Sequence, residues 1–573
     1  MKTVFRYLKD YYKRMALGFT FKIVATFSEL MIPYILSHVL KNVIGSSVSY
    51  IVLWGSLMII CSIFACVGNV TANRMAAAVS KNFAQTLRRD LFDKTLRLSA
   101  AQTDRFTIPS LESRITTDTY NVHSFVNMMQ RMGVRAPIML AGGVTITLFM
   151  DAKLSLVMIA LLPLIFITVY LIRRNGVPLY TMVQKSIDKM IRVVREDTQG
   201  IRVIKALSKT DYEHRRYDTV NKALVKDEVH AGVVMGAVNP IMTMFMNMGS
   251  VSVIALGAVY VSKGSSNPET VIAFMQYFTQ ISMAMMAVTR MFVMYTKCDA
   301  SAKRIEEVLL CEEDITVKSK TDYPDIKTDA HIVFDNVTFS YKGKRNNLKD
   351  ISFQVKKGGH IGIIGATGSG KSTIVKLLLR FYDVSSGGIY INGEDIRTIP
   401  KPALYAKFGS ALQYDFLYAD TIEENIKFGR DICHEDVVAA AKIAQAHDFI
   451  TGFPEGYNHL LSPHGTNISG GQKQRVLISR ALAGNPEILI LDDSSSALDY
   501  KTDAALRAAL SENLKETTVV TVAQRVSSVK SCDVILVIDH GEIIGLGTHE
   551  ELLEKCEEYR EISESQMGGA FVD

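Results

Sequence analysis

Long apolar segments alternate with charged ones along the first half of the chain. Each apolar segment is close to the roughly 20 residues that a helix needs to cross a lipid bilayer, so the pattern predicts six membrane-spanning helices. The segments cover residues 19–44, 50–70, 134–150, 154–172, 238–261 and 270–295. Only a short polar stretch separates the third from the fourth, which predicts a tight hairpin at one membrane face.

Two segments between these spans, residues 71–133 and 173–237, are far too long to be turns. Both are rich in charged residues and carry apolar residues at helical spacing, so the membrane helices are expected to continue into the cytosol. The helical pattern breaks at residues 104–110 and 206–213. These breaks fit either short cross-helices that contact a cytoplasmic partner or ordinary surface loops.

The charge distribution predicts the orientation of the chain in the membrane. The formal net charge is +6, hydrophobic residues make up 48% of the sequence, and the mean hydropathy is +0.15. The basic residues cluster beside the apolar segments. Membrane proteins generally carry an excess of Lys and Arg in their cytoplasmic loops, and this rule explains the clustering better than nucleic-acid binding does. Both termini are therefore predicted to be cytoplasmic. The seven cysteines show no metal-ligand spacing and are expected to be free thiols.

The second half of the chain has the composition of a soluble domain. A polar, charged stretch at residues 306–330 predicts a linker between a transmembrane domain at residues 1–305 and a further domain at residues 331–565. In this further domain, strand-like and helix-like patterns alternate, as they do in α/β folds. The predicted fold class is a membrane α-helical bundle with long cytoplasmic extensions, fused to an α/β domain.

A glycine-rich turn lies between an apolar run and a helix-like segment of this second domain. Backbone N–H groups in such a turn surround an anion, Lys371 adds charge for the outer phosphates, and the Ser372 hydroxyl is a hard oxygen ligand for Mg²⁺. The turn consists of Gly365, Ala366, Thr367, Gly368, Ser369, Gly370, Lys371, Ser372 and Thr373. The sequence therefore predicts a phosphate-binding loop.

Two further motifs indicate a complete nucleotide site. The apolar run at residues 488–491 reads as a buried parallel strand, and Asp492 at its end is placed to hold Mg²⁺ on a bound nucleotide. Between the loop and this strand, a second anion-binding motif opens a predicted helix. It consists of Ser469, Gly470, Gly471 and Gln472.

The combination of these motifs resembles an ATP-binding cassette (ABC). The loop matches Walker A, the strand ending at Asp492 matches Walker B, and the motif at Ser469 matches the signature of this family. Six spans ahead of one cassette resemble a half-transporter of the exporter type over nearly the whole chain. The resemblance implies a P-loop NTPase domain with ATP and Mg²⁺ as ligands. It also implies that Tyr341 stacks on adenine and that Gln413 contacts Mg²⁺ and the surroundings of the attacking water.

Two positions depart from the family pattern. Hydrolytic cassettes carry Glu after the Walker B aspartate, whereas this chain has Asp493, whose side chain is one methylene shorter. A displacement on the order of 1 Å in a catalytic group can cost ~10²-fold in rate. Gln524 stands where the family has a His that contacts the γ-phosphate, and its amide is not ionisable. Together they predict a degenerate site that binds ATP and hydrolyses it poorly.

The signature motif, in contrast, is intact. In the family two cassettes dimerise head to tail, so each ATP lies between the Walker motifs of one chain and the signature of the other. The resemblance therefore implies a second, non-identical half-transporter that supplies the Glu and His. The chain resembles the degenerate-site subunit of heterodimeric bacterial ABC multidrug exporters, which lie in the bacterial cell membrane. Two alternatives remain open: an ATP-gated regulator or channel-like protein, and a homodimeric lipid or peptide exporter with weak ATPase activity.

The spans give weaker indications about the transported compound. Methionines crowd the last two spans, and flexible thioethers suit a cavity for varied amphipathic, drug-like molecules as well as ordinary packing. A carboxylate within a span is costly, so Glu29 is expected to mark a cavity or a cation contact. Gln276 and Gln280 are expected to line the same cavity or to bond helix to helix.

Overall fold

The computed structural model describes the chain except for a few short segments. The described residues are 1–42, 47–264, 266–341, 343, 346–413, 415–494 and 496–567. They form two compact units, which we call the helical unit and the α/β unit. The helical unit comprises Met1–Leu96 and Pro109–Cys311, and the α/β unit comprises Arg97–Ile108 and Glu312–Asp573.

The helical unit is built from long helices. Its helices are α1 (Lys2–Leu8), α2 (Tyr12–Asn42), α3 (Val48–Leu96), α5 (Ile108–Ser113), α6 (Thr119–Met132), α7 (Arg135–Met150), α8 (Ala152–Gln199), α9 (Ile201–Ala206), α10 (Thr210–Gly236), α11 (Val238–Ser262) and α12 (Pro268–Leu309). In the described residues, five segments are long and apolar enough to cross a membrane: Lys2–Asn42, Val48–Leu96, Ile108–Met150, Thr243–Ser262 and Pro268–Val288. The predicted span at residues 154–172 lies in α8, where many side chains are outside the described part of the chain.

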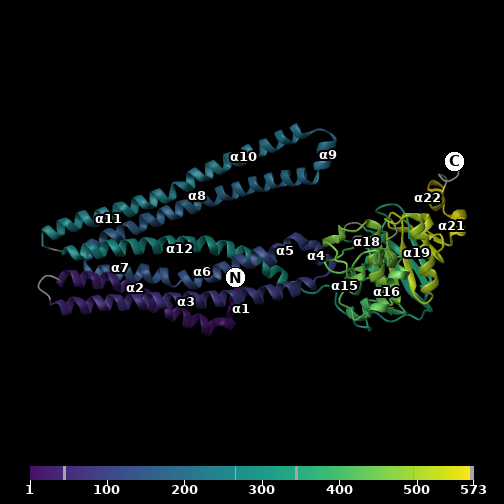
Figure 1. Cartoon of the computed structure of the whole chain (residues 1–573), viewed down its shortest axis with the longest axis horizontal. Helices are drawn as coiled ribbons and strands as arrows, with labels where there is room; N and C mark the ends of the chain where they lie inside the picture. The colour runs from purple at the N-terminus through teal and green to yellow at the C-terminus, as the bar shows by residue number, and fades with distance from the viewer. Residues whose placement is uncertain are drawn as a thin grey trace. The chain divides into compact units, whose positions relative to one another are not determined.

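Several of these helices are much longer than a bilayer is thick. The helix α3 has 49 residues, which corresponds to about 73 Å at 1.5 Å per residue, against a hydrocarbon core of about 30 Å. The helices α8 and α10 lie side by side, and the short α9 joins their ends (Figure 1). The long segments between the predicted spans are thus continuations of the membrane helices.

A short helix lies at or next to each break in the helical pattern. The first is α4 (Ala100–Phe106), which belongs to the α/β unit. Ser99 caps its N-terminus, the Gln102 side chain donates to the backbone carbonyl of Glu312 at 2.6 Å, and the Tyr382 hydroxyl donates to the Asp104 carboxylate at 2.6 Å. The second break follows α9, which ends at Ala206 and whose residues are largely exposed.

Two sheets form the centre of the α/β unit. The smaller sheet is antiparallel, with the order β2-β1-β4-β5, and the larger has the order β10-β9-β3-β8-β7-β6. The strands are β1 (Ala330–Phe339), β2 (Leu348–Lys356), β3 (His360–Ile364), β4 (Ser386–Ile391), β5 (Glu394–Asp395), β6 (Phe408–Ala411), β7 (Ile488–Asp492), β8 (Thr518–Val522), β9 (Val534–Asp539) and β10 (Glu542–Gly547). One buried apolar cluster joins the two sheets around α13 (Lys371–Leu378), and a second covers the other face of the larger sheet.

Helices complete the α/β unit. They are α14 (Lys401–Ala406), α15 (Ile422–Lys427), α16 (His434–Ile443), α17 (His447–Thr451), α18 (Gly470–Leu482), α19 (Tyr500–Asn513), α20 (Val526–Val529), α21 (His549–Lys555) and α22 (Glu557–Met567). Five neighbouring strands of the larger sheet, β9, β3, β8, β7 and β6, run parallel. Their carboxyl ends therefore meet at one edge of the sheet, which is where ligands bind in open α/β folds.

Candidate nucleotide-binding site

The predicted phosphate loop connects β3 to α13 at this edge. Gly368 and Gly370 have φ angles of 84° and 112°, in the left-handed region that glycine adopts without a steric penalty. Gly365 also packs closely, since an added Cβ would lie 2.0 Å from the carbonyl oxygen of Ile538. The glycines thus allow a turn that larger residues would obstruct.

Lys371 lies in the first turn of α13 and faces the loop. Its ammonium donates to the carbonyl oxygens of Gly365 and Ala366, both at 2.8 Å. Burial lowers the pKa of Lys371, because a partly desolvated ammonium is less stable than a hydrated one. A phosphate group would compensate this charge, so the position fits the predicted role.

A cavity of about 190 Å³ brings together most of the predicted residues. Asn347, Val522 and Ala523 are lining residues that the sequence analysis did not assign to the site. The others are Thr367, Gly368, Gly370, Lys371, Ser372, Thr373, Gln413, Asp492, Asp493 and Gln524. Ser369 is buried within the loop, and its hydroxyl has no hydrogen-bond partner in the described chain.

The residues predicted for magnesium lie next to one another. The Ser372 hydroxyl donates to the Asp492 carboxylate at 3.2 Å, and Gln413 lines the same cavity. Burial raises the pKa of Asp492, which means that the ionised carboxylate lacks full compensation there. A hydroxyl, a carboxylate and an amide oxygen are the hard ligands that Mg²⁺ prefers, and a divalent cation would favour the ionised carboxylate. These residues therefore fit a magnesium ion bound with nucleotide phosphates.

The two positions that depart from the family pattern contact each other. The Gln524 amide donates to the Asp493 carboxylate at 3.1 Å, and the Gln413 amide donates to the same oxygen at 3.4 Å. Burial raises the pKa of Asp493, while these hydrogen bonds favour its ionised form. The backbone of Asp493 adopts a φ of 52°, a left-handed conformation that Asp tolerates better than most residues do. The Gln524 and Gln413 amides thus both hold the Asp493 carboxylate.

The predicted adenine-stacking residue lies beside the cavity. The Tyr341 hydroxyl donates to the Thr373 hydroxyl at 3.3 Å, and its ring packs edge-on against Tyr382. The ammonium of Lys376 lies 5.6 Å from the centre of the Tyr341 ring. Tyr341 as a residue is 38% exposed, so a flat ligand can reach it.

The signature motif does not line this cavity. Ser469 caps α18, where its hydroxyl accepts a hydrogen bond from the backbone N–H of Gln472, and the Gln472 side chain accepts from the backbone N–H of Ser469. Gly471 packs closely, since an added Cβ would lie 3.1 Å from the carbonyl oxygen of Ala497. The helix N-terminus is therefore available to an anion that does not sit in the cavity of the same chain.

Comparisons with known proteins agree with the division of the chain into a helical unit and an α/β unit. Residues 15–285 match the family model for the ABC transporter transmembrane region, and residues 348–496 match the model for ABC transporters. The uncharacterized ABC transporter ATP-binding protein YfiB of Bacillus subtilis is 32% identical over 571 residues, which cover 99% of each chain. The chain belongs to the ABC transporter family.

Other similar proteins support the same assignment. The putative ABC transporter ATP-binding protein exp8 of Streptococcus pneumoniae is 30% identical over 582 residues, which cover all of this chain and 98% of the relative. The structure of a bacterial Atm1-family ABC exporter with ATP bound superposes with a TM-score of 0.80 at 23% identity, over 97% of this chain and 98% of that one. The ABC transporter described here therefore has the exporter fold, with transmembrane and ATPase parts in one half-transporter.

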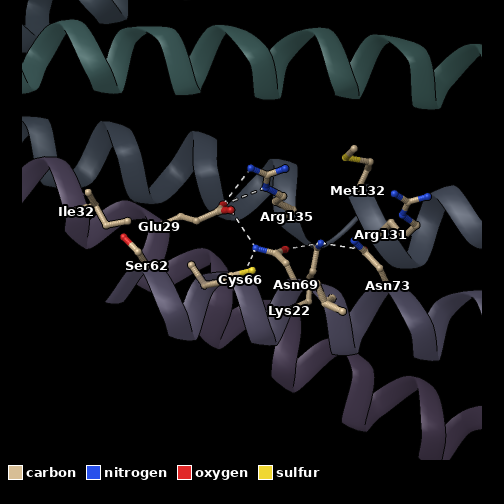
Figure 2. Close-up of a pocket in the computed structure, with 12 residues that line it drawn as sticks. Lys22, Glu29, Ile32, Ser62, Cys66, Asn69, Asn73, Arg131, Met132 and Arg135 are labelled. Atoms are coloured by element: carbon tan, nitrogen blue, oxygen red, sulfur yellow. Dashed lines mark hydrogen bonds and ion pairs between the residues drawn. The ribbon is translucent and has the colours of Figure 1, made fainter. Parts of the chain in front are cut away.

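The predicted substrate-cavity residues of this ABC transporter do not line one common cavity in the described part of the chain. Glu29 lines a cavity of about 510 Å³ in the helical unit (Figure 2). Gln276 and Gln280 on α12 do not line that cavity. Gln276 is exposed, and the side-chain oxygen of Gln280 is buried without a hydrogen-bond partner in the described chain. A role for these two residues in substrate binding stays a prediction.

Proposed function

We propose that this ABC transporter is the degenerate-site subunit of a heterodimeric exporter that moves amphipathic, drug-like compounds out of a bacterial cell. The chain lies in the cell membrane with both termini in the cytoplasm. ATP binds at two sites shared with a non-identical partner and favours the closed pair of cassettes over the separated one. Hydrolysis takes place mainly at the site where the partner supplies the Walker motifs and this chain supplies Ser469 to Gln472.

The contact between Asp493 and Gln524 is the observation that carries this proposal. A catalytic carboxylate must lie within hydrogen-bonding reach of the attacking water, and a side chain that is one methylene short retracts it. Here the carboxylate is also held by two amide donors. An amide at position 524 donates a hydrogen bond but has no titratable imidazole. These features support nucleotide binding with slow hydrolysis.

Exposed apolar side chains on the helical unit support a partner chain. Val203 and Leu207, in and next to α9, are 61% and 63% exposed, and Val229 and Val233 on α10 are 59% and 69% exposed. All four lie outside the predicted spans. Apolar residues repeatedly exposed to water in this way are typical of an interface. We infer that the partner half-transporter covers α9 and this part of α10.

ATPase activity of the chain purified alone in nanodiscs tests the proposal. We expect the wild type to bind ATP but to hydrolyse it slowly, and the double variant Asp493→Glu/Gln524→His to be faster by about 10²-fold, because both groups regain their catalytic positions. Lys371→Ala, which removes the phosphate-binding ammonium, provides the background rate.

The outcome separates the three candidate functions. A wild-type rate of about 1–10³ s⁻¹ for the chain alone would make Asp493 a competent base and favour a homodimeric exporter. ATP-dependent ion conductance without substrate-stimulated ATPase would favour a channel-like protein. A slow wild type with a restored double variant supports the degenerate-site subunit.

A further inference from the structure

The cavity that contains Glu29 lies between α2, α3, α6 and α7 and is rich in cations. Three basic side chains and one carboxylate line it, which leaves two positive charges in excess. Its lining residues are Lys22, Glu29, Ile32, Ser62, Ala65, Cys66, Asn69, Val70, Asn73, Arg131, Met132 and Arg135. Lys22 and Glu29 lie within a predicted span, where charged side chains are costly, whereas Arg131 lies just outside the spans. The excess of positive charge at the cavity favours a ligand of the opposite sign.

The carboxylate is already neutralised within the chain. Glu29 accepts from the Arg135 guanidinium through Nε at 3.2 Å and Nη2 at 3.0 Å, and from the Asn69 amide at 2.9 Å (Figure 2). The sequence predicted that Glu29 marks a cavity or contacts a cation, and in the structure a cation of the same chain takes this position. Glu29 and Arg135 therefore leave no net charge for a ligand.

Lys22 is the more deeply buried of the two remaining cations. Its residue is only 3% exposed, and its ammonium donates to the side-chain oxygens of Asn69 at 2.7 Å and Asn73 at 3.2 Å. These partners are neutral amides, one turn apart on α3, and an ammonium has three protons to donate. Among the described residues, no carboxylate lies within ion-pair distance of Lys22, and Glu29, which is paired with Arg135, acts on its charge only at longer range. A buried ammonium whose direct partners are neutral amides is costly, and an anion at this position would stabilise it.

Arg131 supplies the second uncompensated charge. It lines the same cavity from the end of α6, and no ion-pair partner for its guanidinium occurs in the described part of the chain. Guanidinium groups bind carboxylate and phosphate through parallel N–H donors. The apolar side chains of Ile32, Val70 and Met132 line the same cavity. The cavity thus combines uncompensated positive charge with apolar side chains.

We propose that this cavity binds an amphipathic anion, whose carboxylate or phosphate contacts Lys22 and Arg131 while its apolar part packs against the neighbouring aliphatic side chains. The anion is either an exported compound or the headgroup of a membrane lipid, and both present the same chemistry. The fate of an exported anion rests on the proposed export function. Binding itself does not depend on ATP turnover, so it can be tested separately.

The test measures equilibrium binding of radiolabelled dodecanoate to the full chain in nanodiscs of phosphatidylcholine. Dodecyl phosphate and dodecyltrimethylammonium serve as competitors with the same apolar chain and opposite charges. We expect the anion to compete at least about 10-fold better than the cation. Lys22→Met is expected to weaken dodecanoate binding by about 10- to 100-fold, and the more exposed Arg131→Met by about 3- to 5-fold.

Two further variants separate charge from a structural effect. Glu29→Gln keeps the shape and the hydrogen bond from Asn69 but removes a negative charge, so dodecanoate should bind more tightly. Arg74→Met removes an exposed guanidinium on α3 that does not line the cavity, and it should leave binding unchanged. If Lys22→Met fails to fold, the variants at Glu29 and Arg131 still give opposite expected shifts.

The proposal is wrong if the cation competes as well as the anion, or if Glu29→Gln and Arg131→Met leave dodecanoate affinity unchanged. Phosphatidylglycerol added to the nanodiscs identifies the source of the anion. If this lipid competes with dodecanoate, the cavity binds a lipid headgroup. If it does not compete, the cavity binds a free amphipathic anion. Because no ATP is present, failure here would leave the result of the ATPase experiment untouched.

Discussion

Removing the Tyr382 hydroxyl tests how α4 is held on the α/β unit. This helix follows α3 directly in the chain but belongs to the α/β unit. The hydroxyl donates to Asp104 at 2.6 Å, and the same ring packs edge-on against Tyr341 beside the nucleotide cavity. Tyr382→Phe deletes the hydrogen bond and keeps the ring.

The expected cost follows from the surroundings of the two groups. A hydrogen bond to a charged group contributes about 1.5–3 kcal/mol. The Tyr382 side chain is buried, but Asp104 is exposed, and screening by water reduces the contribution to about 1–2 kcal/mol. That corresponds to a change of about 5- to 30-fold in the ratio of docked to undocked α4. Docking should persist because Gln102 still donates to the carbonyl of Glu312 at 2.6 Å.

Hydrogen exchange of the backbone amides of α4, measured by mass spectrometry on the full chain, reports this equilibrium. We expect protection of residues 100–106 to fall by about 5- to 30-fold in Tyr382→Phe while ATP binding is retained. Tyr405→Phe is the matched control, because no hydrogen bond of the Tyr405 hydroxyl is found in the described chain. Unchanged protection in Tyr382→Phe, or an equal loss in Tyr405→Phe, would refute the reasoning.

Two further predictions concern the same unit. Burial lowers the pKa of His331, so the unfolded chain binds more protons below the ordinary value of about 6.5, and stability should fall by up to about 1.4 kcal/mol per pH unit as the pH drops from 6.5. In His331→Gln, the thermal unfolding temperature should lose this part of its pH dependence. His540→Gln, which alters a side chain that is 86% exposed, should keep it. Equal dependence of the unfolding temperature on pH in the two variants would contradict the assignment to His331. Gly365→Ala should abolish ATP binding, because its Cβ would lie 2.0 Å from the carbonyl oxygen of Ile538. An added Cβ at Gly368 would have no atom within 4 Å, so Gly368→Ala should reduce the stability of the loop only by the roughly 1–2 kcal/mol that a left-handed conformation costs a residue with a side chain. Titration with a fluorescent ATP analogue distinguishes them, and similar affinities would argue against the steric explanation.

The sequence alone determined the features that depend on neighbouring residues. Apolar segments of membrane length, the phosphate loop and the strand that ends at Asp492 are contiguous patterns, and their physical causes act over a few helical turns or one strand. The fused fold of a helical membrane part and an α/β ATPase part followed from them. The sequence also identified Asp493 and Gln524 as unusual, because each stands at a fixed place in a recognisable motif.

Tertiary structure alone decided which distant residues meet. Gln413 and Gln524 lie 80 and 31 residues from Asp493, and they contact it because the larger sheet places the carboxyl ends of β6, β7 and β8 side by side. Strand order is set by long-range pairing, which no local pattern encodes. In the helical unit, the rotation of α2 and α3 about their axes brings Lys22 to Asn69 and Asn73, and no periodicity of the single helices fixes that rotation. The cationic cavity is therefore a property of helix packing.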